Sequence, residues 1–92
     1  MNYKILFEQQ ATKDMRWFRK NDKPSYTKCL DLILSIAETP RDGIGKPERL
    51  RHYKNDEVYS RQISKKDRMV YAIHEEERFV IISNCRGHYG DK

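Results

Sequence analysis

The chain has 92 residues, which is enough for one small domain built around one hydrophobic core. Apolar residues make up 37% of it and charged residues 36%, and the six Tyr, three Phe and single Trp supply enough buriable area to argue against intrinsic disorder. No apolar run approaches the roughly 20 residues of a membrane helix. Residues 1–8 are too short and too mixed for a signal peptide, so we expect a cytoplasmic protein.

Positive charge is concentrated in one part of the chain. The formal net charge is +5, and residues 41–68 hold nine Lys or Arg against five Asp or Glu. Such an excess is typical of a surface that binds a polyanion, although a merely solvated face has the same composition. Cys29 and Cys85 lack CxxC spacing, so we expect reduced, buried thiols. The three histidines lack metal-ligand spacing, so we expect neither a metal nor another cofactor.

The first part of the chain predicts one strand and two helices. Residues 3–8 alternate apolar and polar side chains, as a half-buried strand does. Residues 9–20 carry apolar side chains at helical spacing, and we expect Trp17 to join the core between this helix and a sheet. Pro24 suits the first turn of a second helix over residues 24–38.

Three strands are predicted to close the chain, over residues 58–64, 68–74 and 78–85, with connections short enough for hairpins. The order β-α-α-β-β-β predicts an α+β fold, an antiparallel sheet with two helices on one face, in a single domain over residues 1–92. The expected core residues are Met15, Phe18, Leu30, Ile33, Leu34, Ile73 and Ile81.

The side chains left for chemistry are of few kinds: a basic segment over residues 46–52, arginines on strands, and a terminal His-Tyr pair. The sequence has no Gly-rich phosphate loop after a strand and no GxSxG elbow. Carboxylate, guanidinium and imidazole groups are what metal-free RNA cleavage needs. They supply a base for the 2′-hydroxyl proton, a cation for the phosphorane and an acid for the leaving 5′-oxygen. Composition permits this assembly without showing it.

Four short motifs follow one another between residues 43 and 89. In chain order they are Gly43-x-Gly45-Lys46-Pro47-Glu48-x-Leu50, Tyr59-Ser60-Arg61-Gln62-Ile63, Arg68-Met69-Val70-Tyr71-Ala72-Ile73 and Cys85-Arg86-Gly87-His88-Tyr89. None is specific alone, but the series, ending in His-Tyr, resembles the YoeB/Txe branch of the RelE toxin superfamily. The resemblance implies a microbial-RNase-like sheet and a ribosome-dependent mRNA endonuclease of a type II toxin-antitoxin system. It also implies an acidic, YefM-like antitoxin as partner, and a homodimer in some states.

The same resemblance implies four catalytic residues. Glu48 falls where the family keeps its general base, and Arg68 where it keeps the arginine that faces the scissile phosphate. His88 falls at the general acid, and Tyr89 at the tyrosine that stacks on a base and contacts phosphate. The family's products are a 2′,3′-cyclic phosphate and a 5′-hydroxyl, formed without metal.

Contacts to RNA are expected from Lys46, Arg51, Arg61 and Gln62. For Arg61 a structural role is equally compatible with the sequence. Gln62 departs from the family, which commonly has a second arginine there, in Ser-Arg-Arg-Ile. A further departure is that residues 90–92 extend the chain beyond the His-Tyr pair.

A different class of function remains open, a module that binds RNA or the ribosome without cutting. The basic tract serves both functions equally. Glu48 and His88 distinguish cleavage from binding alone, because phosphate binding gains nothing from a carboxylate and is indifferent to a neutral imidazole. A purely structural interaction protein would need neither residue.

Overall fold

Two helices and five strands make up the part of the chain that the structure, a computed structural model, describes: residues 2–51, 53 and 55–87. In chain order they are β1 (Lys4–Phe7), α1 (Gln9–Asn21), α2 (Lys23–Glu38), β2 (Glu48–Arg49), β3 (Glu57–Gln62), β4 (Arg68–His74) and β5 (Phe79–Asn84). Each expected helix and strand is confirmed with small shifts of its bounds. The short strand β2 lies where the sequence predicts no regular element. Within the described residues, no helix has the length and apolar character that a membrane span requires.

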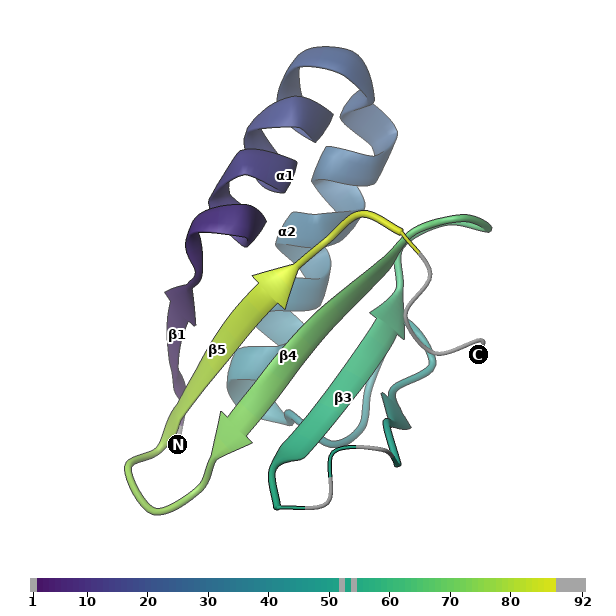
Figure 1. The fold of residues 1–92 in the computed structure, drawn as a ribbon. Helices are drawn as coiled ribbons and strands as arrows, with labels where there is room; N and C mark the ends of the chain where they lie inside the picture. The colour runs from purple at the N-terminus through teal and green to yellow at the C-terminus, as the bar shows by residue number, and fades with distance from the viewer. Residues whose placement is uncertain (1, 52, 54, 88–92) are drawn as a thin grey trace.

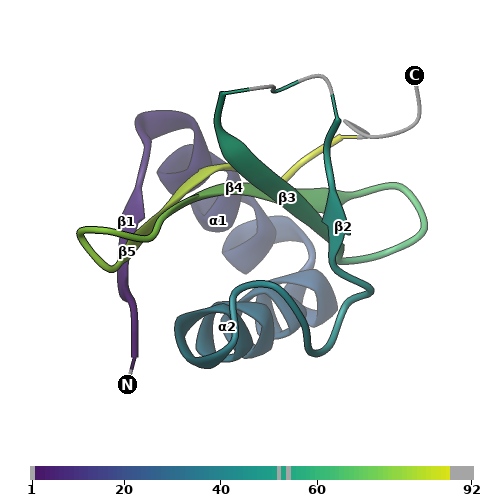
Figure 2. The same ribbon diagram turned by 90° about the horizontal axis from the view of Figure 1, so that it is seen from below.

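The strands form one sheet in the order β1-β5-β4-β3-β2. Both helices cover the same face of this sheet (Figure 1), and the view from below shows them together on one side (Figure 2). The α+β class and the placement of the helices are therefore confirmed. The sheet is mixed rather than wholly antiparallel, because β1 runs parallel to β5. Parallel strands need a long connection, and almost the whole chain separates these two.

The stripe of α2 that faces the sheet differs from the predicted one. Cys29, Leu32 and Ile36 are fully buried, three and four residues apart, as one helix face requires. Leu30 is exposed and 69% of Leu34 is exposed, so their assignment to the core was wrong. Apolar residues occupy nearly every side of α2 in this segment, and periodicity alone could not select the buried side.

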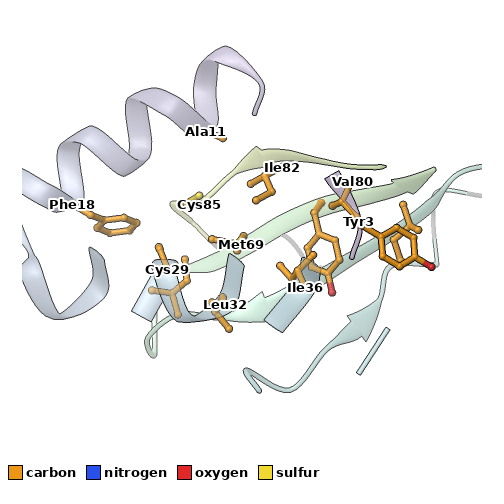
Figure 3. Close-up of a cluster of buried hydrophobic side chains, with 13 residues drawn as sticks. Tyr3, Ala11, Phe18, Cys29, Leu32, Ile36, Met69, Val80, Ile82 and Cys85 are labelled. Atoms are coloured by element: carbon orange, nitrogen blue, oxygen red, sulfur yellow. The ribbon is translucent and has the colours of Figure 1, made fainter. Parts of the chain in front are cut away.

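The core fills the space between the helices and the sheet (Figure 3). Of the other predicted core residues, Phe18 and Ile73 are buried, and Met15 and Ile33 pack against the core while partly buried. Ile81 is half-buried and alternates along β5 with the core residues Val80 and Ile82, so it points to the opposite face and its assignment to the core was wrong. The two cysteines are free thiols, both buried. A hydrogen bond with Cys29 and burial raise the pKa of the Cys85 thiol, which keeps it protonated.

Arg61 is the largest fully buried side chain among the described residues, with 0% exposure. Its Nε donates a hydrogen bond to Tyr71 Oη at 2.9 Å, and its Nη1 donates to Ser35 Oγ at 2.7 Å. The remaining donors serve backbone carbonyls of the α2–β2 loop, those of Ile44 (3.1 Å), Thr39 (2.7 Å) and Asp42 (2.8 Å). Because this side chain has no exposed surface, the expectation that Arg61 contacts RNA was wrong, and its role is structural.

Tyr71 completes this arrangement from β4. Its hydroxyl accepts from Arg61 and donates to the Pro40 carbonyl oxygen at 2.7 Å. Burial raises the pKa of Tyr71, so the phenol remains a donor at neutral pH.

Two glycines let the α2–β2 loop approach Arg61 closely. A Cβ at Gly43 would lie 2.5 Å from Ser35 Oγ, and one at Gly45 would lie 2.6 Å from Leu32 Cδ2. Both residues also have positive φ angles, 123° and 82°, which side-chain-bearing residues rarely adopt. The glycines of the Gly43-x-Gly45 motif are therefore explained by packing.

Leu32 and Leu34 allow a matched test of the buried helix face. Leu32→Ala should lower the free energy of unfolding by about 2–5 kcal/mol, because it leaves a cavity in the core. Leu34→Ala should change it by no more than about 0.5 kcal/mol, because the side chain is mostly in water. Urea unfolding measures both. Equal losses in the two variants would contradict the observed orientation of α2.

Arg61→Ala should lower the free energy of unfolding by at least about 3 kcal/mol, since each buried partner left unpaired costs about 1–3 kcal/mol. Arg61→Lys should also destabilise the fold, because one ammonium group cannot replace the forked guanidinium donors. Arg51→Ala, at an exposed arginine, is the control and should stay within about 0.5 kcal/mol of the parent protein. If Arg61→Ala unfolds at the same urea concentration as Arg51→Ala, the network does not stabilise the fold.

Candidate functional site

Strand register brings a carboxylate and a guanidinium together on the sheet face that the helices leave uncovered. Glu48 on β2 lies opposite Ser60 on β3, and Gln62 on β3 lies opposite Arg68 on β4. Met69, next to Arg68, points into the core. Since neighbouring residues of a strand point to opposite faces, Arg68 points away from the helices.

Arg68 is held mainly by Ser60. Its Nε donates to Ser60 Oγ at 2.9 Å, and its Nη2 lies 3.4 Å from the Ser60 carbonyl oxygen. The same Nη2 is 3.6 Å from Glu48 Oε1, a long ion pair. Within the described part of the chain, Nη1 makes no hydrogen bond. The guanidinium is thus fixed through Nε and Nη2, and Nη1 remains available to donate to a ligand.

The two charged groups differ in their access to solvent. The side chain of Arg68 is 16% exposed, whereas that of Glu48 is 63% exposed. Burial in a shallow site strengthens the attraction of the guanidinium for an anion. The exposed carboxylate remains accessible to a substrate that approaches from solvent.

The turn before Glu48 is fixed by the sheet. The Gln62 backbone N–H donates to the Gly45 carbonyl oxygen at 2.6 Å. Lys46 follows with φ of 52°, a left-handed conformation that is uncommon outside glycine. The Lys46 carbonyl oxygen lies 3.5 Å from Arg68 Nη2. This loop therefore delivers Glu48 to β3 and adds a weak contact to Arg68.

The chain that follows β5 is anchored beside Arg68. The Arg68 backbone N–H donates to the Gly87 carbonyl oxygen at 3.1 Å, and the Gly87 N–H donates to Asp67 Oδ1 at 2.9 Å. Gly87 has φ of 106°, which favours glycine at this turn. Two residues earlier, the Cys85 N–H donates to Oδ2 of the buried Asp14 at 2.8 Å. Two carboxylates thus fix the chain immediately before its C-terminal residues.

The predicted site residues are only partly brought together. Glu48 and Arg68 are neighbours, and Gln62 lies half-buried beside Arg68 in the register. The side chains of Lys46 and Arg51 are exposed at the two ends of the segment that contains β2. His88 and Tyr89 lie outside the described residues.

Sequence reasoning missed two residues that position the site, Ser60 and Asp67. Ser60 belongs to the motif over residues 59–63, and its spacing of two from Gln62 could have placed both side chains on the same face of the strand. Asp67 gave no such signal, because its partner Gly87 is 20 residues away in the sequence.

The arrangement can hold an anion at Arg68 and accept a proton at Glu48. In the described residues, no three His, Cys, Asp or Glu side chains gather in a way that could hold a metal ion. The chemistry that the guanidinium of Arg68 and the carboxylate of Glu48 can supply is charge stabilisation and proton transfer.

Known proteins match the chain over almost its whole length. The family model described as the YoeB-like toxin of bacterial type II toxin-antitoxin systems matches residues 7–89. Toxin YoeB of Synechocystis sp. is 41% identical over 86 residues, covering 94% of this chain and 96% of that protein.

Two solved structures from Staphylococcus aureus share the fold. The YoeB dimer has a TM-score of 0.81 and 35% identity, with 97% of this chain and 100% of that chain covered. The heterotetrameric YoeB-YefM toxin-antitoxin complex has a TM-score of 0.78 and 34% identity, with 97% and 100% covered. With a family match over residues 7–89 and relatives this similar in sequence and structure, the chain belongs to the YoeB-like toxins of bacterial type II toxin-antitoxin systems.

Proposed function

We propose that this toxin is a ribosome-dependent endonuclease that cleaves mRNA and so inhibits translation. The observation that supports the proposal is the pairing of Glu48 with Arg68, 3.6 Å apart, on the uncovered face of the sheet. A base next to a phosphate-binding cation is what cleavage by the 2′-hydroxyl requires. The anchored Gly87 adds support, because His88 follows it directly in the sequence.

In the proposed reaction, Glu48 removes the proton from the 2′-hydroxyl, and the 2′-oxygen attacks the adjacent phosphorus. Arg68 stabilises the negative charge that accumulates on the phosphorane oxygens. The bond from phosphorus to the 5′-oxygen breaks, and this oxygen receives its proton from His88, since an imidazole with an ordinary pKa of about 6.5 suits transfer near neutral pH. The products are a 2′,3′-cyclic phosphate and a 5′-hydroxyl, and no step requires a metal.

The other site residues take part in RNA binding. Tyr89 stacks on a base and contacts phosphate. Lys46 and Arg51 attract the phosphate backbone from their exposed positions, and Gln62 contributes a neutral hydrogen-bonding group where relatives commonly carry an arginine. Arg61 is not part of this set, because it is buried.

The proposed partner that restrains the toxin is an acidic, YefM-like antitoxin. The Staphylococcus aureus toxin, 34% identical to this chain, forms a heterotetrameric complex with YefM. The basic surface formed by the exposed Arg51 and the partly buried Arg68 suits an acidic segment of such a partner. A homodimer is also proposed, because the Staphylococcus aureus YoeB was solved as a dimer.

Glu48→Gln and His88→Gln should each slow cleavage of ribosome-bound mRNA by at least about a hundredfold, because each removes a group that transfers a proton. Arg68→Ala should slow it about 10²–10³-fold, because the phosphorane loses its cation. Gel analysis of a programmed ribosome complex measures these rates, and cleavage by the parent protein should survive EDTA.

Glu76→Gln is the matched control, since this exposed carboxylate lies in the β4–β5 turn at the opposite end of β4. It should cleave like the parent protein. Glu48→Gln should also keep the parent melting temperature, because its side chain is mostly in water. Full activity in both Glu48→Gln and His88→Gln would overturn the nuclease mechanism and favour a module that only binds RNA.

Association with the antitoxin should slow as salt is added, because electrostatic steering between exposed charges is screened beyond about 10 Å at 0.1 M ionic strength. At low salt, Arg51→Glu should associate with the antitoxin more slowly than the parent protein does, because an attractive charge becomes a repulsive one. Lys4→Glu is the control, because the exposed Lys4 lies on β1, at the sheet edge opposite β2. Stopped-flow mixing measures these rates, and an association rate that ignores ionic strength would count against an acidic contact segment.

A further inference from the structure

The exposed face of α1 carries a second cluster of positive charge, apart from the site. Lys13, Arg16 and Lys20 recur three and four residues apart, so they lie along one side of the helix. All three side chains are exposed. The buried side of α1 is formed by Ala11, Asp14 and Phe18. We refer to Lys13, Arg16 and Lys20 as the α1 basic stripe.

The α1 basic stripe has no acidic neighbours along the helix. Positions three and four residues from each of its members hold Gln, Thr, Trp, Pro or another basic residue. Like charges at this spacing destabilise a helix. Among the described residues, no carboxylate forms an ion pair with any of the three. The helix therefore carries an uncompensated repulsion, which an anionic ligand would relieve.

Trp17 lies beside this stripe and holds a fourth cation. Trp17 is 39% exposed, so the expectation that it belongs to the core was wrong. The Arg86 guanidinium carbon lies 3.7 Å from the centre of the ring, a cation–π contact. A shallow pocket of about 330 Å³ opens beside the ring, lined by Lys13, Arg16, Trp17, Lys20 and Asn21.

Arg86 connects the α1 basic stripe to the Glu48–Arg68 site. It is followed in the chain by Gly87, whose carbonyl oxygen accepts a hydrogen bond from the Arg68 backbone N–H. The two-residue segment Arg86–Gly87 therefore contacts the backbone of Arg68 through Gly87 and the Trp17 ring through Arg86. The contact with Trp17 and the backbone hydrogen bond at Gly87 thus place Arg86 between α1 and the start of β4, where Arg68 lies.

We propose that the α1 basic stripe, with Arg86, binds the phosphodiester backbone of the RNA strand whose scissile phosphate lies at Arg68. The inference rests on the proposed function, because it extends the same substrate beyond the site. A flexible polyanion fits this surface, since its regularly spaced phosphates can follow cations arranged in a line. The cation–π contact with Trp17 keeps the Arg86 guanidinium beside α1.

Binding can be measured without cleavage by using 2′-O-methyl RNA, which lacks the attacking hydroxyl. The probes are a fluorescent trinucleotide, which can fill only the site, and a fluorescent dodecanucleotide, which can also reach α1. The test variant is the triple Lys13→Gln, Arg16→Gln, Lys20→Gln. The matched control is the triple Lys4→Gln, Arg41→Gln, Arg78→Gln, which removes the same charge from the opposite end of the molecule.

The stripe triple should bind the dodecanucleotide at least about tenfold more weakly at low salt, and its slope of log K against log salt should be smaller by about 2, at about 0.7 per phosphate contact for single strands. The control triple should change this affinity less than about threefold. Affinity for the trinucleotide should be the same in both triples. The stripe triple should melt no lower than the parent protein, because helix repulsion is removed.

Equal loss of dodecanucleotide affinity in the two triples would overturn the inference, since net charge alone would explain it. A stripe triple that loses affinity only for the antitoxin would overturn it too, because the surface would then serve a protein. The inference also fails if the parent protein binds the dodecanucleotide no tighter than the trinucleotide. The proposed function is tested separately: it would be contradicted if Glu48→Gln and His88→Gln both cleaved mRNA as fast as the parent protein.

Discussion

Arg61 is a charged group buried without a carboxylate partner among the described residues. The position of the site depends on the hydrogen bonds that satisfy its guanidinium. A guanidinium removed from water must have its donors satisfied. Here Ser35, Tyr71 and three carbonyl groups of the α2–β2 loop satisfy them. The same bonds fix the loop against the sheet, and the loop leads directly into the strand that carries Glu48. The position of the proposed base therefore depends on a residue that no substrate can reach.

Strand β3 links this buried network to the open face. Arg61 points toward the helices, and its neighbour Ser60 points the other way and accepts a hydrogen bond from Arg68. Adjacent residues of one strand thus hold the loop of the proposed base on one face and the proposed phosphate-binding arginine on the other. Asp67 and Gly87 then fix the end of β5 to the start of β4. Preorganisation of this kind reduces the reorganisation that a charge-stabilising site must undergo during reaction.

The distribution of charge also follows from the fold. In the sequence, the basic excess lies in residues 41–68, and one of its arginines, Arg61, is buried and unavailable to a polyanion. A second basic surface arises on α1, where the cations are separated by other residues and only the helix period aligns them. Arg86 lies against α1 because of its cation–π contact with Trp17, and Gly87 after it bonds to the backbone of Arg68. Counting charges along the chain identifies the first region and overlooks the second.

The sequence by itself determined the order of the two helices and of four of the five strands, the bounds of β4, and the family motifs. These depend on residues close together in the chain, whose periodicity reflects local geometry. Only the tertiary structure decided the buried side of α2, the parallel pairing of β1 with β5, and the closeness of Glu48 to Arg68. It also decided that Arg61 is buried, because the groups that satisfy its guanidinium lie 10 to 26 residues away in the chain. Burial is set by what distant segments pack against a side chain, and no local pattern records that.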